Sequence, residues 1–138
     1  MAETADAALL IQDFAAEQIT TLRHAVARLA GGVGLRGQRL DDFVLAVNEI
    51  VTNAVRHAGG VGRLRLWVQD GTVRCTVSDR GAGLPREWLD GPPAQPSRFS
   101  VGGRGLWLAR HLCDALTVRS GSAGTSITLV SAIDRLAG

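Results

Sequence analysis

Hydrophobic positions along the chain follow two periods, and these divide it into helical and extended segments. Over residues 16–29 apolar side chains recur every three or four positions, which predicts an amphipathic helix that the glycine-rich stretch GGVGLRG ends. The same period predicts a second helix over about 38–57 and a third over about 105–114. A short first strand is predicted over residues 8–12.

Two other regions alternate apolar and polar residues and are predicted to form β-hairpins. RLRLWV and TVRCTVSD flank Asp70-Gly71, a dipeptide typical of a two-residue hairpin turn. LTVRS and TSITLVSA are joined by the turn 121–124. Helices and hairpins in this order predict an α+β fold: a two-layer sandwich with a mixed, mostly antiparallel sheet covered on one face by helices.

The length and composition fit one compact domain spanning residues 1–138. The chain is 46% hydrophobic and 20% charged, which excludes a disordered protein. All 15 basic residues are arginines, and the absence of lysine excludes a Walker A loop, a eukaryotic-type protein kinase and a Schiff-base site. The net charge of +2 gives no strong case for direct nucleic-acid binding.

The cysteines and the N-terminus indicate the compartment. Cys75 and Cys113 lie in apolar patterns without metal-ligand or CxxC spacing, so both are predicted to be reduced core residues. The sequence MAETADAALL lacks the basic start of a secretory signal, and no apolar run is long enough to span a membrane. The protein is therefore predicted to be cytoplasmic and not membrane-bound.

Three groups of polar or glycine residues do not fit a plain core, and the first lies on the second predicted helix. Glu49, Asn53 and His57 are four residues apart, so they form one stripe along the edge of the apolar arc. A stripe at that border suits a helix that lines a pocket. It also suits an ordinary solvated flank.

The second group lies at the ends of two predicted strands. Alternation places Asp79 on the face of Val77, and Thr125 on the face of Ile127, so both polar side chains are predicted to point inward. A buried carboxylate is costly unless something pairs with it, and a nucleobase edge would satisfy both groups. The alternative is an aspartate that starts a turn and a threonine bonded to nearby backbone.

The third group is the glycine-rich sequence GGRG, which runs into the helix that contains Leu106. Free N–H groups and the positive end of the helix dipole at such an entry suit phosphate, and Arg98 and Arg104 could add charge. A flexible turn that merely starts a helix is the alternative. The Rossmann fingerprint is not matched.

Taken in order, NEIVTNAVRH, SDRGAGLP, GGRGLWLA and GTSITL resemble the N, G1, G2 and GT boxes of the GHKL ATPases. The short form with N-E-x-V-T-N-A looks like the RsbW and SpoIIAB group of anti-sigma factors. The resemblance covers about residues 19–133 and implies a Bergerat-type ATP-binding fold.

The resemblance also implies roles for individual residues. Asn53 matches the asparagine that holds Mg²⁺ against the phosphates of ATP, and Glu49 matches the carboxylate proposed to activate the attacking hydroxyl. Asp79 matches the aspartate that accepts the adenine amino group, and residues about 84–101 match the ATP lid. The remaining nucleotide-binding positions implied by the boxes are Gly81, Gly83, Gly103, Arg104, Gly105, Leu106 and Thr125.

The function implied is that of an anti-sigma factor with protein-serine kinase activity, whose partners are a sigma factor and an anti-anti-sigma protein of the STAS type. A homodimer is a further possibility, and the segment before residue 19 matches too weakly to indicate partner choice. An ATP-binding regulatory module without kinase activity is the alternative. A detached histidine kinase domain is disfavoured because His24 lies within the first predicted helix of the fold.

Overall fold

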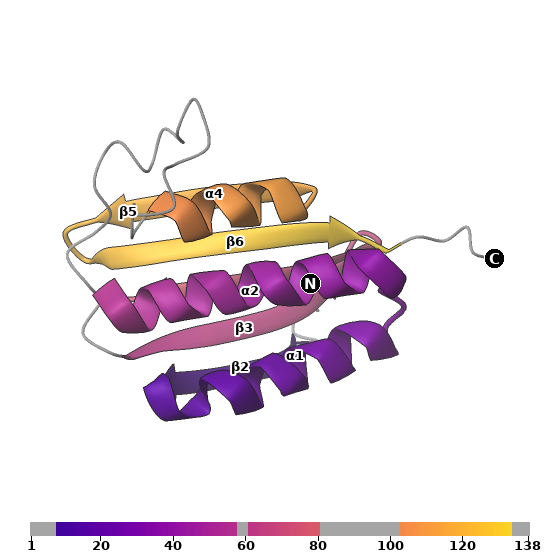
Figure 1. The fold of residues 1–138 in the computed structure, drawn as a ribbon, viewed down its shortest axis with the longest axis horizontal. Helices are drawn as coiled ribbons and strands as arrows, with labels where there is room; N and C mark the ends of the chain where they lie inside the picture. The colour runs from indigo at the N-terminus through magenta and orange to yellow at the C-terminus, as the bar shows by residue number, and fades with distance from the viewer. Residues whose placement is uncertain (1–7, 58–60, 81–102, 134–138) are drawn as a thin grey trace, which may run out of the picture.

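The computed structural model describes residues 8–57, 61–80 and 103–133 of the chain. The described part forms two layers, a sheet of strands and a layer of helices (Figure 1). In chain order its elements are β2 (Ala8–Ala15), the 3₁₀ helix η1 (Ala16–Gln18), α1 (Ile19–Gly32), α2 (Gly37–His57), β3 (Val61–Gln69), β4 (Thr72–Asp79), α4 (Gly103–Leu112), β5 (Ala115–Gly121) and β6 (Gly124–Ala132).

The five strands form one sheet in the order β2-β3-β4-β6-β5, and every neighbouring pair is antiparallel. The predicted α+β sandwich is therefore confirmed, whereas the mixed sheet is wrong for the described strands. The reason is topological: α1 and α2 bring the chain back antiparallel to β2, and the β5–β6 hairpin inserts β6 beside β4. β4 and β5 run in the same direction, but β6 lies between them, so no two neighbouring strands among those described are parallel.

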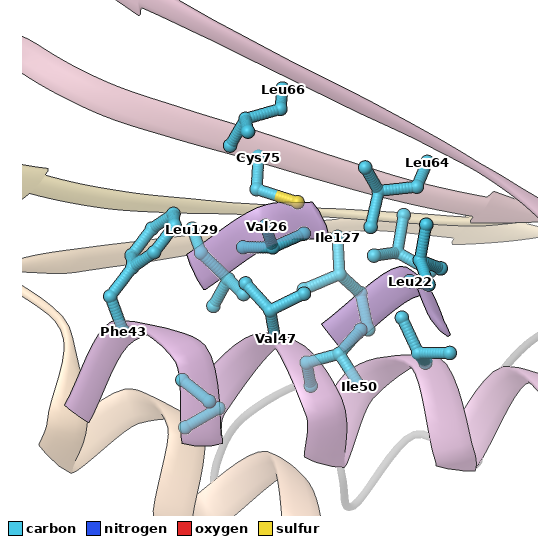
Figure 2. Close-up of a cluster of buried hydrophobic side chains, with 14 of the residues drawn as sticks. Leu22, Val26, Phe43, Val47, Ile50, Leu64, Leu66, Cys75, Ile127 and Leu129 are labelled. Atoms are coloured by element: carbon cyan, nitrogen blue, oxygen red, sulfur yellow. The ribbon is translucent and has the colours of Figure 1, made fainter. Parts of the chain in front are cut away.

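The three α-helices lie over the same face of the sheet (Figure 1). Figure 2 shows Phe43, Val47 and Ile50 of α2 pointing toward the side chains of the strands. All of these core side chains are almost fully buried, because the period of the helix and the alternation of the strands bring two apolar faces together. The strand residues that Figure 2 labels in this core are Leu64, Leu66, Cys75, Ile127 and Leu129.

Element ends differ from the sequence prediction mainly around the first helix. Strand β2 continues to Ala15, and α1 begins only at Ile19, because the Oε1 atom of Gln18 accepts a 2.7 Å hydrogen bond from the Ala15 N–H and holds the 3₁₀ turn between them. The helix extends through Gly32. It ends where Gly34 adopts φ of +113°, a conformation that glycine allows without a Cβ clash.

The hairpins follow the predicted pattern. Asp70 and Gly71 both have positive φ values, 50° and 74°, as a two-residue turn between right-twisted strands requires. Cys75 is fully buried and Cys113 is partly buried, and both are free thiols, as predicted. Among the described residues, no helix is long and apolar enough to cross a membrane.

The antiparallel arrangement places several element ends on one side of the molecule. The C-terminal ends of α2 and β4 lie there with the N-terminal ends of α4 and β6, at the left of Figure 1. Each of the three unusual polar or glycine groups in the sequence belongs to one of these ends. The fold thus gathers them on one side.

Candidate functional site

Glu49 and Asn53 of the predicted stripe on α2 lie beside the first turn of α4. A Cβ atom added to Gly105 would be 3.0 Å from Asn53 Nδ2 and 3.3 Å from Glu49 Oε1. Both side chains remain partly exposed. The carboxylate and the amide therefore flank the start of a helix.

Glycine at position 105 permits this approach. Leu106 is 1% exposed and Ala109 is 0% exposed, so α4 packs its apolar side closely into the core. A side chain at position 105 would push into the space that Asn53 and Glu49 occupy. The GRGL sequence thus combines a buried leucine that anchors the helix with a glycine that leaves room for polar groups.

Asp79 and Thr125 lie opposite one another at the ends of β4 and β6. Thr125 is only 5% exposed, and Asp79 is partly exposed beyond the buried Val77. Burial alternates along β4 as far as Val77, and the register with buried Thr125 puts Asp79 on the helix-covered face as well.

The turn that precedes Thr125 packs tightly on the end of β4. Gly124 has φ of +133°, and a Cβ atom there would overlap the carbonyl oxygen of Asp79. Only glycine combines that backbone conformation with that contact. The G-T sequence therefore sets the distance between the two strand ends as well as supplying a hydroxyl.

Ser120 of β5 joins this pair, although the sequence analysis did not select it. Its Oγ atom is 3.0 Å from Thr125 Oγ1, and the two hydroxyls share a hydrogen bond. The signal was present, because alternation puts Ser120 on the same face as Leu116 and Val118. It was missed because a serine near a glycine turn is common.

A cavity of about 750 Å³ opens beside Asp79, at the ends of β2, β3 and β4. Asp13 and Arg63 form an exposed ion pair at its wall, with 2.6 Å between Arg63 Nε and Asp13 Oδ1. Hydrogen bonding and charge attraction from Arg63 lower the pKa of Asp13. Among the predicted site residues that the structure describes, only Asp79 lines this cavity, which does not include Glu49 or Asn53.

Other predicted residues fall outside what the structure describes. Gly81, Gly83, Arg98 and the lid at about 84–101 lie in the segment that is not described. Gly103 and Arg104 are the first two residues of α4, where only their backbone is placed. Their roles stay predictions.

The oxygen donors near α4 suit one kind of metal. Within the described ranges no cluster of three or more His, Cys, Asp or Glu side chains could hold an ion by itself. Mg²⁺ commonly takes one or two protein oxygens and completes its shell with phosphate and water. The Asn53 amide oxygen, next to a helix start that favours phosphate, fits such a shared site.

Comparison of the sequence with models of known protein families identifies the family of this chain. The model of the histidine kinase-like ATPase domain matches residues 13–131, which include all the elements that form the site. The chain belongs to the histidine kinase-like ATPase family. The resemblance to GHKL ATPases of the RsbW type, read from the four boxes, is thereby confirmed.

Two curated relatives represent this branch of the histidine kinase-like ATPases. The anti-sigma F factor of Pasteuria penetrans is 33% identical over 106 residues, which cover 71% of each chain. The serine-protein kinase RsbW of Staphylococcus epidermidis is 28% identical over 132 residues, which cover 87% of this chain and 82% of the relative.

Solved structures agree on the fold. The crystal structure of the RsbU and RsbW domains of a Mycobacterium tuberculosis protein superposes with a TM-score of 0.63 at 22% identity, over 90% of this chain and 32% of that one. The histidine kinase domain of a blue-light activated kinase from Erythrobacter litoralis gives 0.57 at 25% identity, over 83% of this chain and 66% of that one. The fold of this chain is thus shared with an RsbW domain and with a histidine kinase domain.

Proposed function

We propose that this chain is an anti-sigma factor that binds Mg-ATP and phosphorylates a serine of an anti-anti-sigma antagonist of the STAS type, thereby regulating a sigma factor. The observation that carries the proposal is the contact of Glu49 and Asn53 with the first turn of α4 at Gly105. Its relatives named anti-sigma F factor and serine-protein kinase RsbW support the partner classes. Because sigma factors act in the cytoplasm, we place the protein there.

Base and phosphates of the nucleotide would use different parts of the site. Asp79 is an acceptor that suits the adenine amino group, and Thr125 lies beside it across the strand pair. The phosphates would lie at the start of α4, where backbone N–H groups and the helix dipole favour negative charge. Asn53 would hold Mg²⁺, which would neutralise phosphate charge when bound.

Glu49 is proposed to act on the attacking serine. Its carboxylate would accept the hydroxyl proton as the serine oxygen bonds to the terminal phosphorus, and the bond from that phosphorus to the bridging oxygen of ADP breaks. Glu49 is one helical turn before Asn53, so both side chains face the same turn of α4. This spacing puts a proton acceptor beside the metal-binding amide.

The kinase activity can be tested by Glu49→Gln, which removes the carboxylate and keeps its shape. We expect transfer of labelled phosphate to the cognate STAS-type protein to fall by about 100-fold or more, the usual contribution of a general base. Affinity for Mg-ATP should stay within about threefold, because Glu49 is assigned to the acceptor rather than to the nucleotide.

The matched control is Glu17→Gln, which removes an exposed carboxylate from η1, outside the proposed site. Undiminished transfer by Glu49→Gln would remove Glu49 from the mechanism. Wild-type protein that binds Mg-ATP but phosphorylates no antagonist would leave the alternative, a nucleotide-binding regulator without kinase activity.

The nucleotide assignment can be tested at Asp79. Asp79→Asn turns half of an acceptor-only group into a donor, so Mg-ATP affinity should fall at least about tenfold by titration calorimetry. Asp70→Asn is the control, because Asp70 lies in the exposed β3–β4 turn at φ of 50°, which asparagine tolerates. Equal affinities for the two variants would contradict the placement of the base.

A further inference from the structure

Three polar side chains form a row across three strands on the helix-covered face. Asp79 of β4 is the register partner of Thr125 of β6, and Thr125 is the register partner of Ser120 of β5. Ser120 and Thr125 share a hydrogen bond of 3.0 Å between their hydroxyl oxygens. The row begins at the group proposed to meet the base and ends at a residue that no family box contains.

Hydrogen-bond direction matters in this row because each hydroxyl has one proton. Thr125 is 5% exposed, so bulk water has little access to its oxygen. If Ser120 donates to Thr125 Oγ1, the proton of Thr125 is left to point away from β5, toward the side of Asp79. The base edge then meets a hydroxyl donor beside a carboxylate acceptor.

We propose that Ser120 is a positioning residue for nucleotide selectivity, which orients the Thr125 hydroxyl as a donor toward an adenine base; this inference rests on the proposed function. The Watson–Crick edge of adenine offers an amino donor next to a ring-nitrogen acceptor. A carboxylate and a hydroxyl donor complement that pair. Guanine in the same pose would place its carbonyl oxygen against the carboxylate and its ring N–H against the hydroxyl donor, and its edge carries an additional amino donor.

The sheet supplies a matched control pair of hydroxyls. Ser78 and Ser126 are hydrogen-bonded at 3.2 Å between β4 and β6, one residue before Asp79 and one after Thr125. Alternation puts them on the opposite face of the sheet, away from the helices. Ser126→Ala therefore removes the same chemical group from the same strand ends without touching the proposed base site.

The test measures Mg-ATP affinity by calorimetry and GTP affinity by competition, in wild type, Ser120→Ala, Ser120→Thr and Ser126→Ala. Ser120→Ala should weaken ATP binding by about three- to tenfold, the value of one hydrogen bond, and leave GTP binding unchanged, so selectivity falls by the same factor. Ser120→Thr, which restores a hydroxyl, should recover the wild-type ratio. Ser126→Ala should match wild type.

A double-mutant cycle shows whether Ser120 acts through Thr125. In the Thr125→Val background, Ser120→Ala should have almost no further effect, because the hydroxyl it orients is gone. Thermal unfolding of each variant identifies a folding defect. If Ser120→Ala is destabilised, Ser120→Cys, with similar volume and a weak donor, replaces it.

Separate outcomes overturn the two proposals. If wild type binds ATP and Ser120→Ala binds it equally well, or if its effect adds fully to that of Thr125→Val, Ser120 has no positioning role. Equal losses for ATP and GTP also reject the inference, since they indicate a general distortion. Wild type that binds neither nucleotide rejects the proposed function, and this inference with it.

Discussion

Gly105 illustrates how a single residue without a side chain shapes this site. The polar atoms of Asn53 and Glu49 lie where its Cβ would have its nearest contacts, at 3.0 to 3.4 Å. These distances are tight rather than impossible, so a larger residue would displace the two side chains and leave the helix intact. Stability and activity should therefore respond differently to a substitution here.

Gly105→Ala should lower both Mg-ATP affinity and phosphoryl transfer, because a methyl group moves Asn53 and Glu49 away from the start of α4. The free energy of unfolding should stay level or rise by up to about 1 kcal/mol, since alanine is the better helix former. Denaturant unfolding and calorimetry on one preparation measure both effects. Loss of stability together with binding would instead indicate that the helix packs incorrectly.

Gly121→Ala is a fair comparison, because Gly121 has no neighbouring atom within 4 Å of an added Cβ. It also lies at the end of β5, outside α4. We expect it to bind and transfer like wild type. Equal defects in both variants would mean that the contact at Gly105 is not the cause.

At the scale of elements, the site depends on how β4, β5 and β6 end. The β5–β6 turn packs against the carbonyl of Asp79 through Gly124, so the hairpin fixes the end of β4. The strand end in turn carries the carboxylate. Backbone contacts between these elements position a side chain that neither element could place alone.

Gly124→Ala tests that dependence. The alanine would need φ of +133° and would overlap backbone atoms of Asp79 and Arg80, so the free energy of unfolding should fall by about 1–3 kcal/mol or more. Nucleotide affinity should fall as well, because the hairpin must shift from β4. Chemical denaturation and titration calorimetry measure the two losses, and a variant as stable as wild type would contradict the packing described here.

The sequence predicted those features that depend on local periodicity. The inward position of Asp79 follows from four alternate residues of β4, and the Asp70-Gly71 turn follows from its dipeptide. The length of β2 did not follow. Its last residues, Asp13 to Ala15, belong to the strand because they pair with β3, which is fifty residues later.

Contacts between distant elements were also beyond the sequence. A glycine in the first turn of a helix does not reveal that Glu49 and Asn53 occupy the space beside it. The hydroxyl pair of Ser120 and Thr125 depends on the β5–β6 register, which places the two residues opposite each other. The family boxes named many positions of the site but did not indicate how they touch.

At the scale of the whole molecule, the two ends of the sandwich serve different purposes. The end opposite the site is held by Asp114, whose Oδ2 atom accepts hydrogen bonds from Arg39 Nη1 at 2.8 Å and from the Ala132 N–H at 2.6 Å. These bonds link the start of α2, the α4–β5 junction and the end of β6. The far end can therefore be altered without touching Asn53 or Asp79.

Asp114→Ala should lower the free energy of unfolding by about 1–2 kcal/mol, since one charged acceptor serves two donors at partly exposed positions. Mg-ATP affinity should remain within about twofold of wild type. Thermal unfolding without ligand and calorimetry with it provide the two readings. A large loss of affinity would show that the ends are coupled.

The buried thiol of Cys75 can report how often the fold opens. Its sulfur lies in the middle of the core with no exposed surface, and burial raises its pKa far above the usual range, so a thiol reagent must wait for the sheet to open. In a chain with Cys113 replaced by alanine, the modification rate would report how often that opening occurs. A ligand that binds only the closed form would lower the modification rate, because the protein opens only when the ligand has dissociated. The dependence of this rate on ligand concentration would therefore give the affinity.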